Sequence, residues 1–248
     1  MRSNKQWIIG VCVSMILSFL YGVITVQYKI PPLDQLRAIK QIVNPSPSPS
    51  PIASLNPSPS PSYSDYYYHK KSFFEQFEDH QYDIVFIGDS LTDGAEWGDL
   101  FPSLKIANRG INGDRTDGVL KRMDSIYSTN GRKAFIMIGI NDLTGGAEVN
   151  DIVENYKIII SNLVAHRIKT YVQSTLLLDK KCTELNKKIM TLNDHLKKMS
   201  VRNKSFTYID VNAGLAKNTG LDTKYSRDGT HLNGSGYAVW KDIIKSYI

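Results

Sequence analysis

The sequence has few cysteines and none of the short spacings that commonly hold a metal ion. Its two cysteines, Cys12 and Cys182, lie far apart in a chain of 248 residues, and we do not expect them to pair. The CxxC and HExxH spacings are both absent, so the sequence predicts neither a metal site nor a cofactor. No repeat of about 20 to 50 residues is visible, so a repeat architecture is not indicated.

Positive charge is not concentrated in any one stretch of the chain. The formal net charge of +6 is mild and scattered, and no basic stripe with interleaved aromatic residues occurs. Nucleic acid is therefore not an expected partner. The sequence carries no signal for an oligomeric state.

Proline almost disappears after residue 61, and this change divides the chain. Nine of the ten prolines lie at or before Pro61, and only Pro102 follows. Residues 31–63 contain proline–serine alternations at 45–51 and 57–62, which offer too little apolar surface for a core. We expect a disordered, extended linker able to hold a domain about 50 Å away, at about 3.1 Å per residue. A proline-rich ligand for another protein is the alternative.

Residues 6–28 contain no charged side chain, and residues 7–26 have about the length that a helix needs to cross a bilayer. We expect residues 1–30 to form an uncleaved signal anchor. A cleaved signal peptide is the alternative, but the run is long and no clear small-residue cleavage site follows it. Lysine and arginine flank both ends, so their count does not set the orientation. The short tail before the run favours a membrane-anchored protein whose C-terminal part is exported.

After an aromatic-rich lead-in helix expected within residues 63–81, strand-like and helix-like patterns alternate. This alternation predicts one α/β domain over residues 64–248, a doubly wound three-layer α/β/α fold with five mainly parallel strands. The expected strands are residues 84–87, 104–107, 134–138, 170–176 and 206–211, and the expected helices are residues 116–127, 149–166, 183–199 and 233–247.

Polar and glycine-rich motifs follow the expected strands. They are GDS at 88–90, NRGINGD at 108–114, GIND at 139–142 and DGTHL at 228–232. Parallel strands place such loops at one edge of the sheet, where ligands bind in open α/β folds. Without these partners, Ser90 would equally well be a simple helix cap.

The residues at this edge suit acyl transfer. A serine hydroxyl needs a base to take its proton, and His231 can be that base for Ser90. Asp228, three residues before His231, can orient the imidazole and stabilise its cation. On its own, a DxxH spacing usually reflects the polar residues of an ordinary surface loop. The competing histidines, none in an expected strand-end loop, are His69, His80, His166 and His195.

Acyl transfer also needs donors for a developing oxyanion. The candidates are the backbone N–H of Ser90, the backbone N–H of Gly110 and the side-chain amide of Asn141. Gly110 is favoured because a residue without Cβ permits close backbone approach. The alternatives are a left-handed turn position for Gly110 and a turn role for Asn141.

These four motifs, in this order, resemble the four blocks of the SGNH (GDSL-type) hydrolase superfamily over residues 82–248. The wording NRGINGD and HLNGSGY is most similar to the branch that resembles platelet-activating-factor acetylhydrolase. The resemblance implies a flavodoxin-like sheet, Ser90 as nucleophile, His231 as base, Asp228 as its partner, and an oxyanion hole of Ser90, Gly110 and Asn141. Ile87 stands where the family commonly has phenylalanine, a structural position.

The expected function is hydrolysis of small O-acyl esters, most simply acetyl groups on a cell-envelope or extracellular carbohydrate. Lysophospholipase or thioesterase activity on lipid substrates, and acyl transfer to a sugar through the same acyl-enzyme, are the enzymatic alternatives. A non-catalytic carbohydrate-binding module is a further alternative, which the intact Ser90, Asp228 and His231 set disfavours.

Overall fold

The structure, a computed structural model, describes residues 63–77 and 81–248. These residues belong to one compact unit, residues 61–248. The expected signal anchor and nearly all of the expected linker lie outside the described residues, so both stay predictions. Within the described ranges, no helix combines the length and the apolar character that crossing a bilayer requires.

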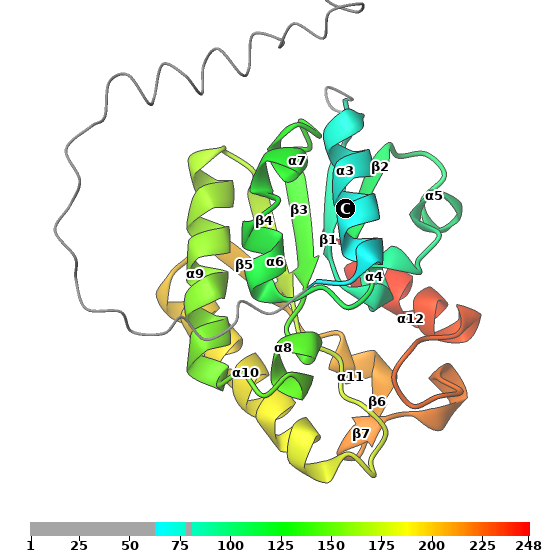
Figure 1. Ribbon diagram of the computed structural model, residues 1–248. Helices are drawn as coiled ribbons and strands as arrows, with labels where there is room; N and C mark the ends of the chain where they lie inside the picture. Colours follow the sequence, from blue (N-terminus) through cyan, green and yellow to red (C-terminus); the bar gives the residue numbers. More distant parts are fainter. Residues whose placement is uncertain (1–62, 78–80) are drawn as a thin grey trace, which may run out of the picture. The chain divides into compact units, whose positions relative to one another are not determined.

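Five parallel strands form the central sheet (Figure 1). Their order is β2-β1-β3-β4-β5, and every neighbouring pair is parallel. The predicted α/β fold with a five-stranded, flavodoxin-like sheet is therefore confirmed. From β1, the chain adds β2 on one side of the sheet and then β3 to β5 on the other side. This change of side between β1 and β3 is a topological switch point, which opens a crevice at the carboxyl ends of the strands. The strands are β1 (Ile84–Gly88), β2 (Ile106–Gly110), β3 (Lys133–Met137), β4 (Lys169–Gln173) and β5 (Phe206–Ile209).

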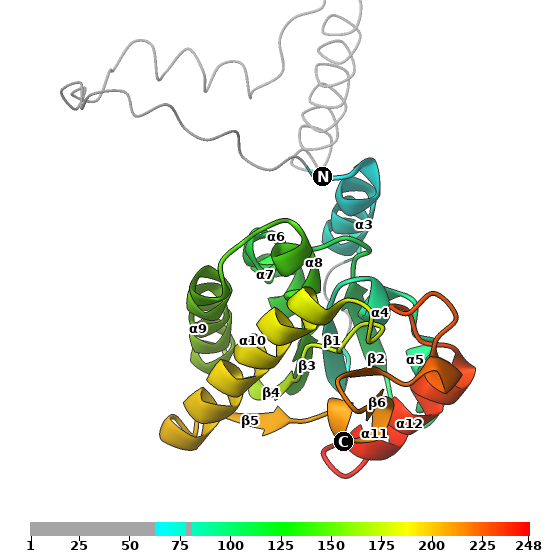
Figure 2. The same cartoon turned by 90° about the horizontal axis from the view of Figure 1, so that it is seen from below.

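Both faces of the sheet are buried under helices, as Figure 2 shows. Alternate residues of β1 serve the two faces: Val85 and Ile87 belong to one apolar cluster, Ile84 and Phe86 to the other. The first cluster contains residues of α6 (Thr116–Leu120), α7 (Met123–Tyr127), α9 (Val149–Ala165) and α10 (Thr183–Arg202). The second contains residues of α5 (Trp97–Leu100), α11 (Asn212–Leu215) and α12 (Gly234–Ile244). Burial on both sides explains why the strands read as continuous apolar runs.

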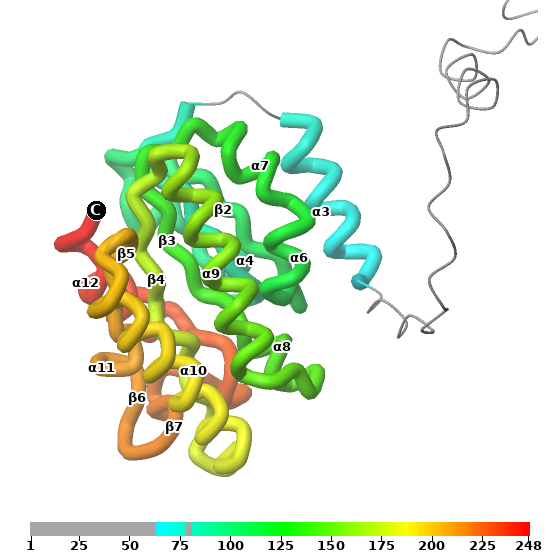
Figure 3. The backbone as a smooth tube through the Cα atoms, turned by 90° about the vertical axis from the view of Figure 1, so that its left-hand side faces the viewer, coloured from blue at the N-terminus to red at the C-terminus, as the bar shows by residue number. Residues whose placement is uncertain are grey.

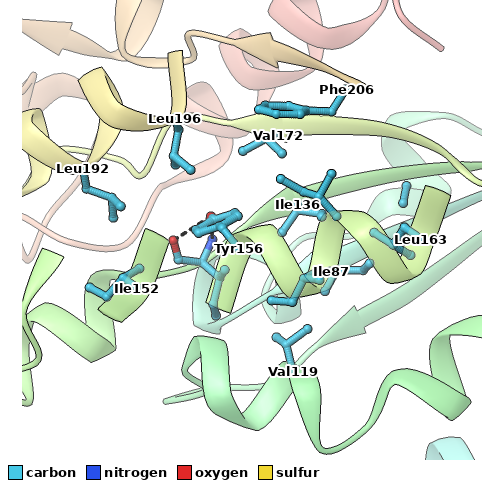
Figure 4. Close-up of a cluster of buried hydrophobic side chains, with 14 of the residues drawn as sticks. Ile87, Val119, Ile136, Ile152, Tyr156, Leu163, Val172, Leu192, Leu196 and Phe206 are labelled. Atoms are coloured by element: carbon cyan, nitrogen blue, oxygen red, sulfur yellow. Dashed lines mark hydrogen bonds between the residues drawn. The ribbon is translucent and has the colours of Figure 1, made fainter. Parts of the chain in front are cut away.

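Tyr156 ties α9 to the end of β3 inside the first cluster (Figure 4). The side chain is fully buried, and its hydroxyl accepts from the Ile138 N–H at 3.1 Å and donates to the Ile138 carbonyl at 2.9 Å. A buried hydroxyl must find such partners or destabilise the fold. The bond fixes the point where the loop bearing Asn141 leaves the sheet.

The predicted helix over residues 116–127 is wrong in one respect, since it is broken into α6 and α7. The break comes at Arg122, whose backbone leaves helical geometry and whose side chain is fully buried. At this break the Arg122 guanidinium lies inside the protein, where it pairs with Asp114. The long helices α9, α10 and α12 confirm the predicted elements. The sequence did not predict α4 (Ser90–Asp93), α8 (Ile140–Thr144), α5, α11, the 3-10 turn Thr223–Tyr225, or the hairpin of β6 (Ala216–Lys217) and β7 (Gly220–Leu221).

The lead-in helix is present as α3 (Asp65–Gln76), capped by Ser64, which accepts from the Tyr67 N–H at 3.2 Å. It packs through Tyr67 and Phe74 onto Ile111, just after β2. The Tyr67 hydroxyl donates to the Gly118 carbonyl of α6 at 2.9 Å. Figure 3 shows α3 beside α6 and α7. Helix α3 is thus part of the domain.

Candidate active site

Ser90 is the first residue of α4, directly beyond the carboxyl end of β1. The helix cap is Asp89, whose carboxylate accepts from the Leu91 N–H at 3.1 Å. Burial raises the pKa of Asp89 to about 7. Because Asp89 caps the helix, the alternative role of Ser90 as the cap does not apply, and its hydroxyl is left for other partners.

The structure brings Ser90, His231 and Asp228 into one hydrogen-bonded chain. Ser90 Oγ lies 3.0 Å from His231 Nε2, although 141 residues separate them in the sequence. His231 Nδ1 lies 2.7 Å from Asp228 Oδ2. The predicted trio therefore meets in the order that general-base activation of a serine requires.

Asp228 is held in place by its own loop. Its Oδ1 accepts from the backbone N–H groups of Thr230 and His231 at 2.9 and 2.8 Å, and from Ser226 Oγ at 3.2 Å. The His231 ring, followed by the two backbone donors, holds the pKa of the Asp228 carboxyl well below its usual range. Asp228 is consequently a carboxylate at any pH near neutrality, as a partner for an imidazolium must be.

The His231–Asp228 pair is open to solvent. Their side chains are 51 % and 57 % exposed. An exposed pair leaves room for a bulky group beside Ser90. The other described histidines have different surroundings; for example, His166 stacks on Tyr127 with ring centroids 3.6 Å apart.

The structure corrects the prediction that Gly110 offers a free donor. The Gly110 N–H donates to Asn108 Oδ1 at 2.9 Å, so it is already taken. The absence of a side chain has another cause: a Cβ on Gly110 would lie 2.2 Å from the backbone N of Asp93. Gly110 therefore allows the end of β2 to pack directly against α4.

Gly113, three residues further on, is a candidate donor that the sequence analysis did not name. Within the described ranges its N–H meets no acceptor, and the space around its Cα is open. Its φ of +76° is a left-handed conformation that glycine adopts without strain. The second glycine of NRGINGD was the available signal, because it is the position of that motif that needs positive φ.

Asn141 lies against the same loop. Its Nδ2 donates to the Asp114 carbonyl at 2.9 Å, and a primary amide has a second hydrogen to offer. The Ser90 N–H, at the first position of α4, has no acceptor in the described part of the chain. Three donors thus remain for a developing negative charge: the Ser90 N–H, the Gly113 N–H and one hydrogen of the Asn141 amide.

The loop that carries Gly113 is braced from inside the protein. Asp114 pairs with Arg122 at 2.8 Å, and both side chains are fully buried. Arg122 also donates to the Gly88 carbonyl at the end of β1, at 3.4 Å. Both Asp142 carboxylate oxygens accept from the Thr116 N–H at 3.1 Å. These contacts join the ends of β1, β2 and β3 into one framework.

No cluster of three or more histidine, cysteine, aspartate or glutamate side chains suited to a metal ion occurs in the part of the chain that the structure describes.

Curated relatives share part of the sequence. The N-acylneuraminate cytidylyltransferase of Streptococcus agalactiae is 28% identical over 138 residues, which cover 52% of this chain and only 32% of that protein. The chain therefore spans about a third of that relative's length. The platelet-activating factor acetylhydrolase IB subunit alpha2 of Gallus gallus is 26% identical over 168 residues, covering 65% of this chain and 73% of that protein.

Solved structures share the fold. A GDSL-like lipase from Bacteroides thetaiotaomicron aligns with a TM-score of 0.65 at 22% identity, covering 73% of this chain and 96% of that one. An acetyl-xylooligosaccharide esterase from Geobacillus aligns with a TM-score of 0.57 at 14% identity, covering 68% and 95%. At these identities the likeness concerns the fold alone.

A family model matches residues 86–239, which is more than half of the chain and contains Ser90, Gly113, Asn141, Asp228 and His231. The motif order and the meeting of serine, histidine and aspartate agree with this match, and the chain belongs to the GDSL-like lipase/acylhydrolase family.

Proposed function

We propose that the protein is a serine esterase that removes small acyl groups, foremost acetyl, from oxygen through an acyl-enzyme on Ser90. The observation that carries the proposal is the continuous chain from Ser90 Oγ to His231 Nε2 at 3.0 Å and from His231 Nδ1 to Asp228 at 2.7 Å. This arrangement activates a hydroxyl that would otherwise be a weak nucleophile.

In the acylation step, Ser90 Oγ attacks the ester carbonyl while His231 Nε2 takes the hydroxyl proton. The imidazolium faces the Asp228 carboxylate, then gives the proton to the departing alkoxide, which leaves as an alcohol. In the second step, His231 takes a proton from water, the resulting hydroxide attacks the acyl carbon, and the proton returns to Ser90. The products are an alcohol and a carboxylic acid.

The negative charge that develops on the carbonyl oxygen is received by the N–H groups of Ser90 and Gly113 and by the Asn141 amide. Two of these donors are backbone groups that cannot rotate away, and preorganised donors stabilise the transition state more than the substrate. Gly113 takes the place that the sequence had given to Gly110, because the Gly110 N–H already serves Asn108.

Two observations support a small acyl group on a bulky alcohol. The His231–Asp228 pair is half exposed, so the alcohol side of the ester meets open space. One relative, 73% of whose length is aligned with this chain, is named as an acetylhydrolase. A protein of the same fold is named as an acetyl-xylooligosaccharide esterase. Acetyl esters of cell-envelope or extracellular carbohydrate are the substrate class that we propose.

We further propose, from the sequence of residues 1–63, that the enzyme is anchored in the membrane with its domain exported.

The test is a series of p-nitrophenyl esters from acetate to palmitate, assayed with and without EDTA, with Ser90→Ala as the control. We expect the highest kcat/KM at acetate or butyrate and no effect of EDTA. A preference for chains of about eight carbons or more would replace the proposal with a lipid acylhydrolase. Loss of activity in EDTA would remove the metal-free mechanism.

A further inference from the structure

Helix α3 lies before the family-matched residues 86–239, so family membership assigns it no role. Its aromatic residues Tyr67 and Phe74 account for its packing. Two other side chains on α3, Tyr66 and Lys70, make contacts that packing does not require. Both reach Asp93, the last residue of the short helix that begins at Ser90.

Asp93 collects three donors from two separate segments. Its Oδ1 lies 2.8 Å from Lys70 Nζ, and its Oδ2 accepts from the Tyr66 hydroxyl at 2.7 Å. The same Oδ2 accepts from the backbone N–H of Asn112 at 3.2 Å. The Asp93 side chain is only 11 % exposed and that of Lys70 27 %, so water screens this pair less than an ordinary surface pair.

The Asn112 N–H is one peptide unit away from the Gly113 N–H. On the other side of Gly113, the Asp114 N–H donates to the Ile111 carbonyl at 3.0 Å. The peptide unit that carries the Gly113 N–H is therefore flanked by two bonded units. One of these bonds is internal to the loop, while the other depends on the position of the Asp93 carboxylate.

We propose that α3 is a working part of the active site, in which Tyr66 and Lys70 are positioning residues that fix Asp93 and, through the Asn112 N–H, the Gly113 donor of the oxyanion hole. The inference rests on the proposed acyl-enzyme mechanism. It adds to that mechanism a segment outside the matched family region. Tyr66 and Lys70 touch neither substrate nor reacting atoms in this account.

A donor displaced from its best position stabilises the transition state less while leaving substrate binding nearly unchanged. Loss of Tyr66 or Lys70 should therefore lower kcat and spare KM. The pH dependence should also be preserved, because His231 and Asp228 lie on a different loop. A merely structural helix would give no such division between kcat and KM.

The experiment uses the full chain and p-nitrophenyl acetate, with Tyr66→Phe and Lys70→Met as test variants. We expect each to lower kcat about threefold to tenfold with KM within about twofold, and Lys70→Arg to recover most of the loss. The matched controls are Tyr68→Phe and Lys71→Met on the same helix, since Tyr68 is exposed and Lys71 pairs with Glu75. Circular dichroism establishes that every variant is folded at the assay temperature.

A second measurement combines Tyr66→Phe with Asp93→Ala. We expect the double variant to lose less than the product of the two single losses, because both changes remove the same hydrogen bond. The inference is overturned if the test variants behave as the controls do, if only KM changes, or if the losses simply multiply. An active Ser90→Ala variant would instead refute the proposed function, whereas an inactive Ser90→Ala beside a normal Tyr66→Phe would refute only the role of α3.

Discussion

Two loops at the same edge of the sheet supply the candidate chemistry, and they are built in opposite ways. The loop at residues 226–231 carries Asp228 and His231, is largely exposed, and is held mainly by hydrogen bonds among its own residues. The loop at residues 111–116 carries Gly113 and is fixed by residues from distant segments, among them Arg122 and Asp142. One loop is encoded locally and the other by the tertiary structure.

The difference follows from what each loop must do. A base and its carboxylate exchange protons with substrate and water, so they need access, and short-range bonds suffice to orient them. Oxyanion donors act only if they are already in place when charge develops, so they need support that does not yield. Buried charges such as Asp114 and Arg122 provide such support because separating them leaves a buried ion without a partner.

Removing the base gives the largest expected effect. His231→Ala should lower kcat on the order of 10⁴-fold or more, since no other group takes the Ser90 proton. Because the side chain is half exposed and lies on a locally bonded loop, the melting temperature should hardly change. Esterase assays and thermal melts of the same preparation check both statements. A strongly destabilised His231→Ala protein would show that the two loops are not built differently.

Removing the internal brace should act on stability. Arg122→Met leaves Asp114 buried without its partner, and we expect a loss of about 3–5 kcal/mol in the free energy of unfolding. The matched control is Lys121→Met, whose pair with Asp117 is exposed and should contribute about 0–1 kcal/mol. Urea unfolding measures both. Equal losses for the two neighbours would contradict the bracing role of the buried pair.

A substitution of Asn141 distinguishes a role as oxyanion donor from a role in holding the loop that carries Gly113. Asn141→Ala should lower kcat on the order of 10²-fold with little change in KM, because the amide serves the oxyanion. Steady-state kinetics with p-nitrophenyl acetate give the two constants. A change confined to KM would instead make Asn141 a substrate-binding residue.

The smallest effect is expected inside the histidine loop. Ser226 Oγ donates one bond of 3.2 Å to Asp228, while the Thr230 and His231 N–H groups remain. Ser226→Ala should lower kcat by only about twofold to fivefold and leave the pH profile in place, because the donors that lower the Asp228 pKa are kept. Activity measured from about pH 5 to 9 tests this. A displaced profile would mean that Ser226 governs the charge of Asp228.

The residues of the candidate site that the sequence could place at one edge of the sheet are those encoded by local order. Ser90, Asn141 and His231 each lie within an identifiable motif. The carboxyl ends of parallel strands lie at one edge of the sheet, and this rule was enough to bring the three residues together. The α/β fold was predictable for the same reason, because buried strands and amphipathic helices have distinct periodicities.

The parts that failed depend on contacts that no spacing reveals. Gly110 was predicted as a donor because the hydrogen bond from its N–H to Asn108 is visible only in three dimensions. The helix break at Arg122 was not predicted, because the sequence does not distinguish a buried arginine from one at the surface. The strands of the β6–β7 hairpin have two residues each, too short for any periodic pattern.

The most direct test of the account is covalent labelling of the nucleophile. Intact and peptide mass spectrometry after treatment with diisopropyl fluorophosphate should show one adduct, on Ser90, formed in step with the loss of activity. His231→Ala should label far more slowly, because the hydroxyl then has no base. A label on another residue, or equal labelling of the His231→Ala protein, would contradict the central claim that Ser90, His231 and Asp228 act as one catalytic chain.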